Sequence, residues 1–267
     1  MNKIKLIALD IDGTLLNSKG EVSKKNQEAI AYAERQGIYV ILATGRMYRS
    51  ANHFAQYFNS DMPIITYNGG MIREFNYGAK LFEQNMPLKM VRPVYETTKK
   101  YDLSVNFYIN DNLYGNEGHK YIKEYAEHIK VPYQTLKDEE IFRLIEDENI
   151  IKMVAVEDAE ILDDFLAKEY DNFKDELYLV KSLPFFLEIA HKGINKGTGL
   201  EALGDILGIR PEEMLAVGDN LNDEEMLELV GYPIIMANGH DDLKERGYFI
   251  TGTNDDDGVA RAIGQFI

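Results

Sequence analysis

Short apolar runs alternate with segments of helical spacing at the start of the chain. Runs at 6–9, 39–43 and 63–66 have the length of buried strands. Ser23 and Gly37 are a suitable N-cap and a suitable stop for a helix between the first two runs. Strand, helix, strand, helix, strand is typical of a parallel sheet with helical crossovers. The helix between the second and third runs is predicted from residues at helical spacing: Met47, Ala51, Phe54, Ala55 and Phe58.

The same alternation returns near the C-terminus. The pattern predicts helices at 196–207, 224–230 and 258–266. It predicts strands at 214–217, 233–236 and 248–250. Both ends of the chain therefore belong to one α/β fold with a parallel sheet.

The middle of the chain has a different texture. Residues 105–109 and Leu113-Tyr114 flank an Asn-Asp-Asn turn, which predicts a hairpin. Further strands are expected at 152–156, 177–180 and 185–189, mixed with amphipathic helices. Hairpins and helices together indicate an α+β unit with an antiparallel sheet. We therefore predict an α/β core and an inserted domain, with these boundaries: core at 1–82 and 185–267, insertion at 83–184.

Five of the six predicted core strands run into a motif with a polar residue or glycine. Ligands of open α/β sheets bind outside the carboxyl ends of the strands, and parallel strands bring all those ends to one edge. We therefore expect five residues that are scattered in the sequence to converge there: Asp10, Thr44, Asn68, Asp219 and Asn238.

The first of these strand ends carries two acids, Asp10 and Asp12. Alternation along an extended strand would point both side chains to the same side. Paired carboxylates at a buried strand end are costly unless a cation or protons offset their repulsion. With Asp219 and Asp223, up to four carboxylates would meet in one site, and this number of oxygen ligands suits Mg²⁺.

Two further segments suit an anion. Thr44, Gly45 and Arg46 lie where a strand meets a helix N-terminus, and backbone amides and the helix dipole favour an anion there, although a plain N-cap has the same pattern. Lys196 begins a predicted helix, where a lysine is unfavourable to the dipole. Lys192 lies close by in sequence, and spacing alone does not choose between the two lysines.

Composition narrows the classes of partner. The chain has 267 residues, a net charge of -16 and no cysteine, which excludes thiol nucleophiles and cysteine metal sites. Its acidity disfavours nucleic acid and anionic membranes as partners, while a bound metal and local bases still allow an anionic small molecule. No apolar run approaches the length of a membrane span or a signal-peptide core, so we expect a cytoplasmic protein.

Four motifs in order resemble those of the haloacid dehalogenase superfamily: Asp10-x-Asp12-Gly13-Thr14, Thr44-Gly45, Lys196, and Gly218-Asp219-x-x-Asn222-Asp223. They fall in the predicted core, which this resemblance implies is Rossmann-like. The insertion between the second and third motifs resembles the C2-type cap of Cof-type sugar phosphatases. By the same resemblance, the cap closes over the site and contacts the leaving group.

The resemblance also implies roles for these residues. Asp10 would be the nucleophile and Asp12 the general acid and base. Mg²⁺ would be held by Asp10, the backbone carbonyl of Asp12, and Asp219, with Asp223 as a ligand or behind one. Thr44, Gly45 and Lys196 would hold the phosphoryl oxygens with Asn222 nearby, while Arg46 and Asn68 would lie toward the substrate.

The predicted activity is Mg²⁺-dependent hydrolysis of a small phosphorylated metabolite, such as a sugar phosphate, by a monomer or weak homo-oligomer. Two alternatives share the chemistry. A phosphosugar mutase of the same superfamily would return the phosphoryl group to the substrate. A phospho-aspartate signalling module also uses acids, a hydroxyl residue and a lysine on a parallel sheet, but the large insertion argues against it.

Overall fold

The computed structural model describes residues 3–58, 62–147 and 149–267, which separate into two compact units. The α/β unit comprises Met1–Phe82 and Asn195–Ile267, and the inserted unit comprises Glu83–Ile194. No helix among the described residues is long and apolar enough to cross a membrane.

The boundary after Phe82 lies where the sequence pattern changes, but the predicted return at residue 185 is wrong. The α/β unit resumes at Asn195. The reason is the pairing of β11 (Phe186–His191), which is antiparallel to both β9 (Ile150–Val156) and β10 (Leu177–Leu183). These residues therefore complete the sheet of the inserted unit.

The α/β unit is built on five parallel strands in the order β14-β13-β12-β1-β2, which confirms the predicted fold class. A parallel bridge from Ala43 to Ile65 places β3 beside β2. The chain then turns back into β4, antiparallel to β3, a pairing that the sequence did not predict. The strands are β1 (Leu6–Leu9), β2 (Tyr39–Leu42), β3 (Pro63–Thr66), β4 (Met71–Glu74), β5 (Lys80–Glu83), β12 (Met214–Gly218), β13 (Tyr232–Ile235) and β14 (Phe249–Ile250).

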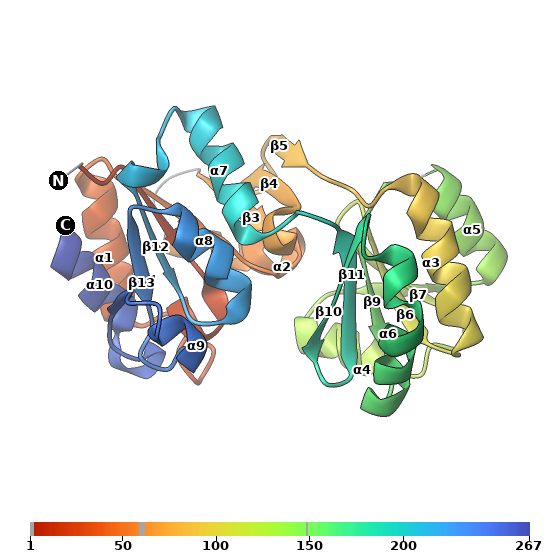
Figure 1. Ribbon diagram of the computed structural model, residues 1–267. Helices are drawn as coiled ribbons and strands as arrows, with labels where there is room; N and C mark the ends of the chain where they lie inside the picture. The colour runs from red at the N-terminus through yellow and green to blue at the C-terminus, as the bar shows by residue number, and fades with distance from the viewer. Residues whose placement is uncertain (1–2, 59–61, 148) are drawn as a thin grey trace. The chain divides into compact units, whose positions relative to one another are not determined.

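Helices cover both faces of this sheet (Figure 1). Leu6 and Ala8 of β1 share a buried apolar cluster with Leu200 and Leu203 of α7. The alternate residues of β1 point to the opposite face, where α1 and α10 lie side by side. The helices are α1 (Lys24–Arg35), α2 (Tyr48–Ala51), α7 (Lys196–Leu207), α8 (Glu224–Leu229), α9 (Asp241–Lys244) and α10 (Gly258–Phe266).

Local signals explain most of these boundaries. The Ser23 hydroxyl accepts a hydrogen bond from the Asn26 amide and so begins α1 as expected. Gly208 ends α7 in the left-handed conformation, with φ 66°. The helix predicted from Met47 to Phe58 is instead one short α-helix followed by a 3₁₀ segment, Asn52–Tyr57.

The inserted unit holds a six-stranded sheet in the order β10-β11-β9-β6-β7-β8. The predicted hairpin is confirmed, because β6 and β7 pair antiparallel across Asn110 and Asp111, both at positive φ. The sheet is antiparallel except for β7 and β8, which run parallel. Its elements are α3 (Leu88–Lys100), β6 (Ser104–Ile109), β7 (Asn112–Asn116), α4 (Ile122–Ile129), β8 (Tyr133–Leu136), α5 (Asp138–Asp147), β9, α6 (Ala159–Phe173), β10 and β11.

The two faces of this sheet differ in their helical cover. Val105 and Phe107 of β6 point into one apolar core with residues of α3, α5 and α6. Tyr108, which alternates with Phe107, points to the other face, where its hydroxyl bonds the hydroxyl of Tyr125 on α4. One short helix therefore covers part of the second face.

Candidate active site

Asp10 and Asp12 lie on a tight turn that follows β1. Strand pairing ends at Leu9, the Leu15 amide donates to the Asp10 carbonyl at 3.3 Å, and Gly13 takes φ 83°. The prediction that alternation along a strand aligns the two carboxylates is therefore wrong, because the strand has already ended. Asp10 is buried, whereas the side chain of Asp12 is 58% exposed.

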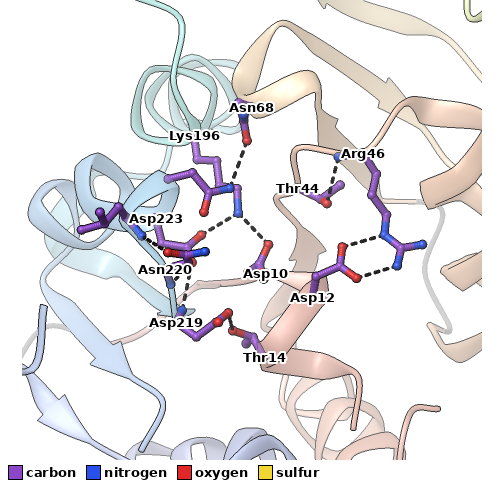
Figure 2. A network of polar contacts seen from close by, with 12 residues as sticks. Asp10, Asp12, Thr14, Thr44, Arg46, Asn68, Lys196, Asp219, Asn220 and Asp223 are labelled. Atoms are coloured by element: carbon purple, nitrogen blue, oxygen red, sulfur yellow. Dashed lines mark hydrogen bonds and ion pairs between the residues drawn. The ribbon is translucent and has the colours of Figure 1, made fainter. Parts of the chain in front are cut away.

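Lys196 lies in the first turn of α7, fully buried between two carboxylates. Its Nζ donates to Oδ1 of Asp10 and to Oδ1 of Asp223, each at 2.6 Å (Figure 2). Burial disfavours the ammonium form, but the two carboxylates outweigh it and raise the pKa of Lys196. Lys192, the alternative from the sequence, is exposed and belongs to the inserted unit.

Two glycines allow the start of α7 to pack this closely. A Cβ at Gly197 would lie 2.5 Å from the carbonyl oxygen of Glu225, and a Cβ at Gly199 would lie 2.7 Å from the Cα of Gly69. The Asn195 side chain caps the helix by accepting from the Thr198 amide. Backbone contacts on two sides therefore hold the helix turn that carries Lys196.

Asp219 and Asp223 follow β12, and each is held by a hydrogen bond. Oδ1 of Asp219 accepts from the Thr14 hydroxyl at 2.8 Å. Oδ2 of Asp223 accepts from the backbone amides of Asp219 and Asn220 at 2.9 and 3.1 Å. Burial raises the pKa of Asp219 to about 6. A Cβ at Gly13 would lie 2.3 Å from Oδ2 of Asp219, so glycine is required beside this carboxylate.

Carboxylate oxygens of three acids, Asp10, Asp219 and Asp223, lie within 4.8 Å of one another. Burial raises the pKa of Asp10 well above its usual value, although Lys196 opposes this, and the other two acids raise it further. A hard divalent cation offsets such repulsion, and its preferred ligands are oxygens, so this donor set fits Mg²⁺. The expected fourth carboxylate, that of Asp12, is not in the cluster, because it pairs with Arg46 instead.

Arg46 and Asp12 form a two-pronged ion pair. Nε of Arg46 donates to Oδ2 of Asp12 at 2.7 Å, and Nη2 donates to Oδ1 at 2.6 Å. The Arg46 amide donates to the Thr44 hydroxyl at 3.2 Å, which places this hydroxyl beside the same loop. The guanidinium also lies over the ring of Phe54, 5.2 Å from its centroid.

The loop after β3 is strained. Tyr67, Asn68 and Gly69 all have positive φ, at 54°, 53° and 99°. Such conformations persist where the surroundings enforce them, and they concentrate at functional sites. Here the Asn68 amide donates to the Thr44 carbonyl, and Oδ1 of Asn68 lies 2.9 Å from where a Cβ of Gly45 would be. These contacts therefore hold Asn68 against the loop after β2 in a strained conformation.

The remaining predicted residues join the same edge. Nδ2 of Asn222 donates to Oδ1 of Asn68 at 3.3 Å. Nδ2 of Asn238 donates to the carbonyl of Gly13 at 2.8 Å, which ties the loop after β13 to the turn after β1. The loops that follow five strands are thus linked to one another, as the sequence predicted.

Thr14 also lies in this arrangement, although the sequence reasoning gave it no role. It is fully buried and orients Asp219 across 205 positions of sequence. The available signal was its place directly after the turn glycine, where a short hydroxyl side chain suits a close hydrogen bond to a neighbouring loop.

Comparison with known proteins identifies the family to which this chain belongs. The family model described as haloacid dehalogenase-like hydrolase matches residues 7–263. The 5-amino-6-(5-phospho-D-ribitylamino)uracil phosphatase YcsE of Bacillus subtilis is 32% identical, covering 99% of this chain and 96% of that protein. Two crystal structures are each 31% identical to this chain. The structure of a Thermotoga maritima protein has a TM-score of 0.89, and the match covers 98% of this chain and 97% of that protein. The structure of a haloacid dehalogenase-like hydrolase from Bacteroides thetaiotaomicron has a TM-score of 0.88, and the match covers 99% of this chain and 100% of that protein.

Proposed function

Because this chain belongs to the haloacid dehalogenase-like hydrolase family and is a phosphatase, we propose that it hydrolyses phosphate monoesters with Mg²⁺ through an aspartyl-phosphate on Asp10. The observation that carries this proposal is the pairing of a buried Asp10, bonded to Lys196, with an exposed Asp12 two residues later. The Asp10 carboxylate is held in place and shielded from solvent, whereas the Asp12 carboxylate is accessible to solvent.

Asp10 is the nucleophile of the proposed reaction. Its free carboxylate oxygen attacks phosphorus as the bond from phosphorus to the ester oxygen breaks. Lys196 holds the other oxygen, so the carboxylate is oriented before the substrate arrives. Water then attacks the phosphorus of the aspartyl-phosphate, which releases inorganic phosphate and restores Asp10.

Asp12 moves the protons in both steps. Once released from Arg46 and protonated by solvent, it gives that proton to the leaving oxygen, and in the second step it takes one from the attacking water. Its exposure and its position two residues after Asp10 support this assignment. Arg46 fixes the direction of the Asp12 side chain through the two-pronged pair.

Three acids would hold the metal: Asp10, Asp219 and Asp223, together with the backbone carbonyl of Asp12. Mg²⁺ bound there supplies positive charge that offsets the repulsion between the phosphoryl group and the carboxylates. Thr14 keeps Asp219 oriented toward this position. Asp223 also bonds two backbone amides and Lys196, so it serves partly as a brace.

The phosphoryl oxygens would be bound by Thr44, Gly45 and Lys196, with Asn222 nearby. The strained loop that holds Asn68 beside Gly45 and Asn222 supports a place for Asn68 at the substrate. Arg46 would lie toward the substrate as well, through its pair with Asp12.

The proposed substrate is a small phosphorylated metabolite, a sugar phosphate being the leading class. The inserted unit would act as the cap that selects the organic part of the substrate. A net charge of -16 disfavours nucleic acid as a partner, and we propose a cytoplasmic monomer or weak homo-oligomer. A phosphosugar mutase would convert a hexose phosphate to an isomer, so release of inorganic phosphate without isomer formation tests the choice.

The deciding experiment measures phosphate release from p-nitrophenyl phosphate by the wild type and by Asp10→Asn. We expect the variant to lose turnover while its thermal melt stays cooperative, because the amide keeps the shape but removes the nucleophile. EDTA should silence the wild type, and added Mg²⁺ should restore it. Near-normal activity of Asp10→Asn would overturn the nucleophile assignment, and full activity in EDTA would overturn the metal.

A further inference from the structure

The loop after β13 contacts both of the loops that carry the acids of the proposed metal site. Nδ2 of Asn238 donates to the carbonyl of Gly13 at 2.8 Å, and the backbone amide of His240 donates to the carbonyl of Asp219 at 2.7 Å. Between these two residues, a Cβ at Gly239 would lie 2.9 Å from the same Asp219 carbonyl oxygen, so glycine suits this close approach. The loop after β13 therefore joins the turn after β1 to the loop after β12.

The bond from Asn238 fixes the peptide group that leads into Thr14. A peptide group is planar, so the Gly13 carbonyl and the Thr14 amide turn together. From this position the Thr14 hydroxyl donates to Oδ1 of Asp219 at 2.8 Å (Figure 2). Gly13 itself packs against the same carboxylate, since a Cβ there would lie 2.3 Å from Oδ2 of Asp219. A shift of the turn would therefore change both contacts that it makes with Asp219.

Asn254, in the 3₁₀ segment Asn254–Asp256, holds Asn238 in this orientation. Its backbone amide donates to Oδ1 of Asn238 at 2.9 Å, and its Nδ2 donates to the carbonyl of Leu16 at 2.8 Å. The side-chain amide of Asn238 thus uses its acceptor and one of its donors, which fixes its direction. Two asparagine side chains therefore donate to carbonyls at the two ends of the segment 13–16.

The exposure of Asn238 indicates that its bonds serve the position of the turn more than the stability of the fold. Asn238 is exposed, so water would satisfy its polar atoms if the chain did not. A hydrogen bond adds only a small net amount to stability, and substitutions at the surface usually cost little. Loss of this side chain should therefore leave the protein folded.

Asp219 is the acid of the cluster that depends on this turn. Lys196 donates to Asp10 and to Asp223, each at 2.6 Å. Asp219 accepts its bond from the Thr14 hydroxyl instead. Partners that orient metal ligands from behind typically change metal affinity about 10–100-fold when they are removed. The residues that hold Thr14 in place are therefore expected to influence metal affinity as well.

We propose that Asn238 and Asn254 are positioning residues of the metal site. They hold the turn after β1 so that the Thr14 hydroxyl keeps Asp219 directed at the ion. The proposal rests on the proposed function, in which Asp219 holds Mg²⁺. It gives the loops after β13 and β14 a part in metal binding that they exert through Thr14.

Titration of the metal-free, full-length protein with Mn²⁺ in a calorimeter tests the proposal without a substrate, since carboxylates suit Mn²⁺ as well as Mg²⁺. We expect Asn238→Ala to raise the Kd for Mn²⁺ about tenfold. Asn254→Ala should raise it less, about threefold, because the backbone amide of this residue still bonds Asn238. The control is Gln56→Ala, which removes another exposed bond from a side-chain amide to a carbonyl, that of His53, and should leave the Kd unchanged.

Further readouts distinguish positioning from a merely structural role. The melting temperature of metal-free Asn238→Ala should fall by less than about 3 °C. At saturating Mg²⁺, kcat of this variant for p-nitrophenyl phosphate should stay within about threefold of the wild type. The double variant of Asn238→Ala and Thr14→Val should bind Mn²⁺ no more weakly than Thr14→Val alone, because Asn238 acts through Thr14.

The outcomes separate this proposal from the phosphatase proposal. An unchanged Kd in Asn238→Ala, a loss of kcat that saturating Mg²⁺ does not restore, or effects that multiply in the double variant would overturn the positioning role and leave the phosphatase function in place. If Asn238→Ala weakens Mn²⁺ binding but the wild type releases no phosphate, the positioning role stands and the phosphatase assignment is wrong. A wild type that binds no Mn²⁺ would overturn the metal site and this proposal together.

Discussion

Replacing Thr14 with valine removes one hydrogen bond from Asp219 and leaves the shape of the side chain nearly unchanged. The Thr14 hydroxyl donates to Oδ1 of Asp219 at 2.8 Å, and Thr14 is fully buried, so no water replaces it easily. A hydrogen bond to a charged group contributes about 1.5–3 kcal/mol. Because about 1.4 kcal/mol is a factor of ten, we expect the Mg²⁺ concentration for half-maximal activity to rise roughly 10–100-fold.

Protonation of Asp219 adds a second effect on the Mg²⁺ requirement, and this effect depends on pH. Burial raises the pKa of Asp219 to about 6, and the Thr14 hydrogen bond opposes that rise. Losing that hydrogen bond therefore moves the pKa of Asp219 further up. Protons would then compete with the metal at neutral pH. The Mg²⁺ requirement of Thr14→Val should therefore increase more steeply than that of the wild type between pH 8 and pH 6.

The assay is a Mg²⁺ titration of phosphate release at pH 8 and pH 6, with thermal melts to check folding. Thr14→Ser keeps the hydroxyl and is the matched control, so it should behave like the wild type. At saturating Mg²⁺, kcat of Thr14→Val should return to within about threefold, since this residue acts through Asp219. Identical Mg²⁺ curves for Thr14→Val and the wild type, or equal damage in Thr14→Ser, would refute the reasoning.

Three further predictions follow from the structure. Arg46→Met should slow hydrolysis of an alkyl phosphate about tenfold, because Asp12 loses its orientation, and should slow hydrolysis of p-nitrophenyl phosphate less, because a good leaving group needs little help from an acid. Equal losses on both substrates would count against a role of Arg46 in orienting Asp12. Gly69→Ala should lower the free energy of unfolding by more than about 2 kcal/mol, because φ is 99° at this position and the new Cβ would lie 2.1 Å from the Asn195 carbonyl oxygen. The control is Gly20→Ala, where φ is 76° and no atom lies within 4 Å of the new Cβ, so it should cost less in the same urea titration. Burial lowers the pKa of His119 from 6.5 to about 4, so the free energy of unfolding should fall by about 3 kcal/mol as the pH falls from 6.5 to 4. In urea titrations His119→Gln should make the free energy of unfolding depend less on pH over this range, and an unchanged dependence would contradict the burial argument.

The fold of the α/β unit was predictable because its signals are local. The strands β1, β2, β3, β12 and β13 are short apolar runs, and α1 and α7 each begin with a side-chain cap that acts within a few residues. The bounds of α7 and α10, at 196–207 and 258–266, were given by the sequence pattern alone. The inserted unit was less predictable: the segments that became α3 and α5 were not recognised as helices, and β11 shows no local mark of the unit to which it belongs. Its assignment depends on pairing with β10, directly before it in sequence, and with β9, some thirty residues away.

The candidate site, too, could be predicted only in part from the sequence. The strand ends predicted that Asp10 and Asp219 meet at one edge of the parallel sheet, whereas Lys196 followed from the family resemblance, since spacing did not separate it from Lys192. The direction of each side chain did not follow from spacing. Asp12 turns to Arg46 instead of joining the other acids, and Thr14 reaches Asp219, because a tight turn and a close packing contact decide those orientations. Such contacts involve partners far away in the chain, and no pattern within a single motif encodes them.

The position of β1 between β2 and β12 has a consequence for synthesis of the protein. A growing chain emerges with β1 and β2 early, but the partner for the other edge of β1 begins at residue 214. Until the ribosome has added most of the polypeptide, an apolar central strand keeps one unpaired edge, which is prone to aggregation. The nascent chain is therefore most vulnerable in the interval during which the inserted unit is translated, and a product that terminates within that interval would have neither Lys196 nor a stable sheet.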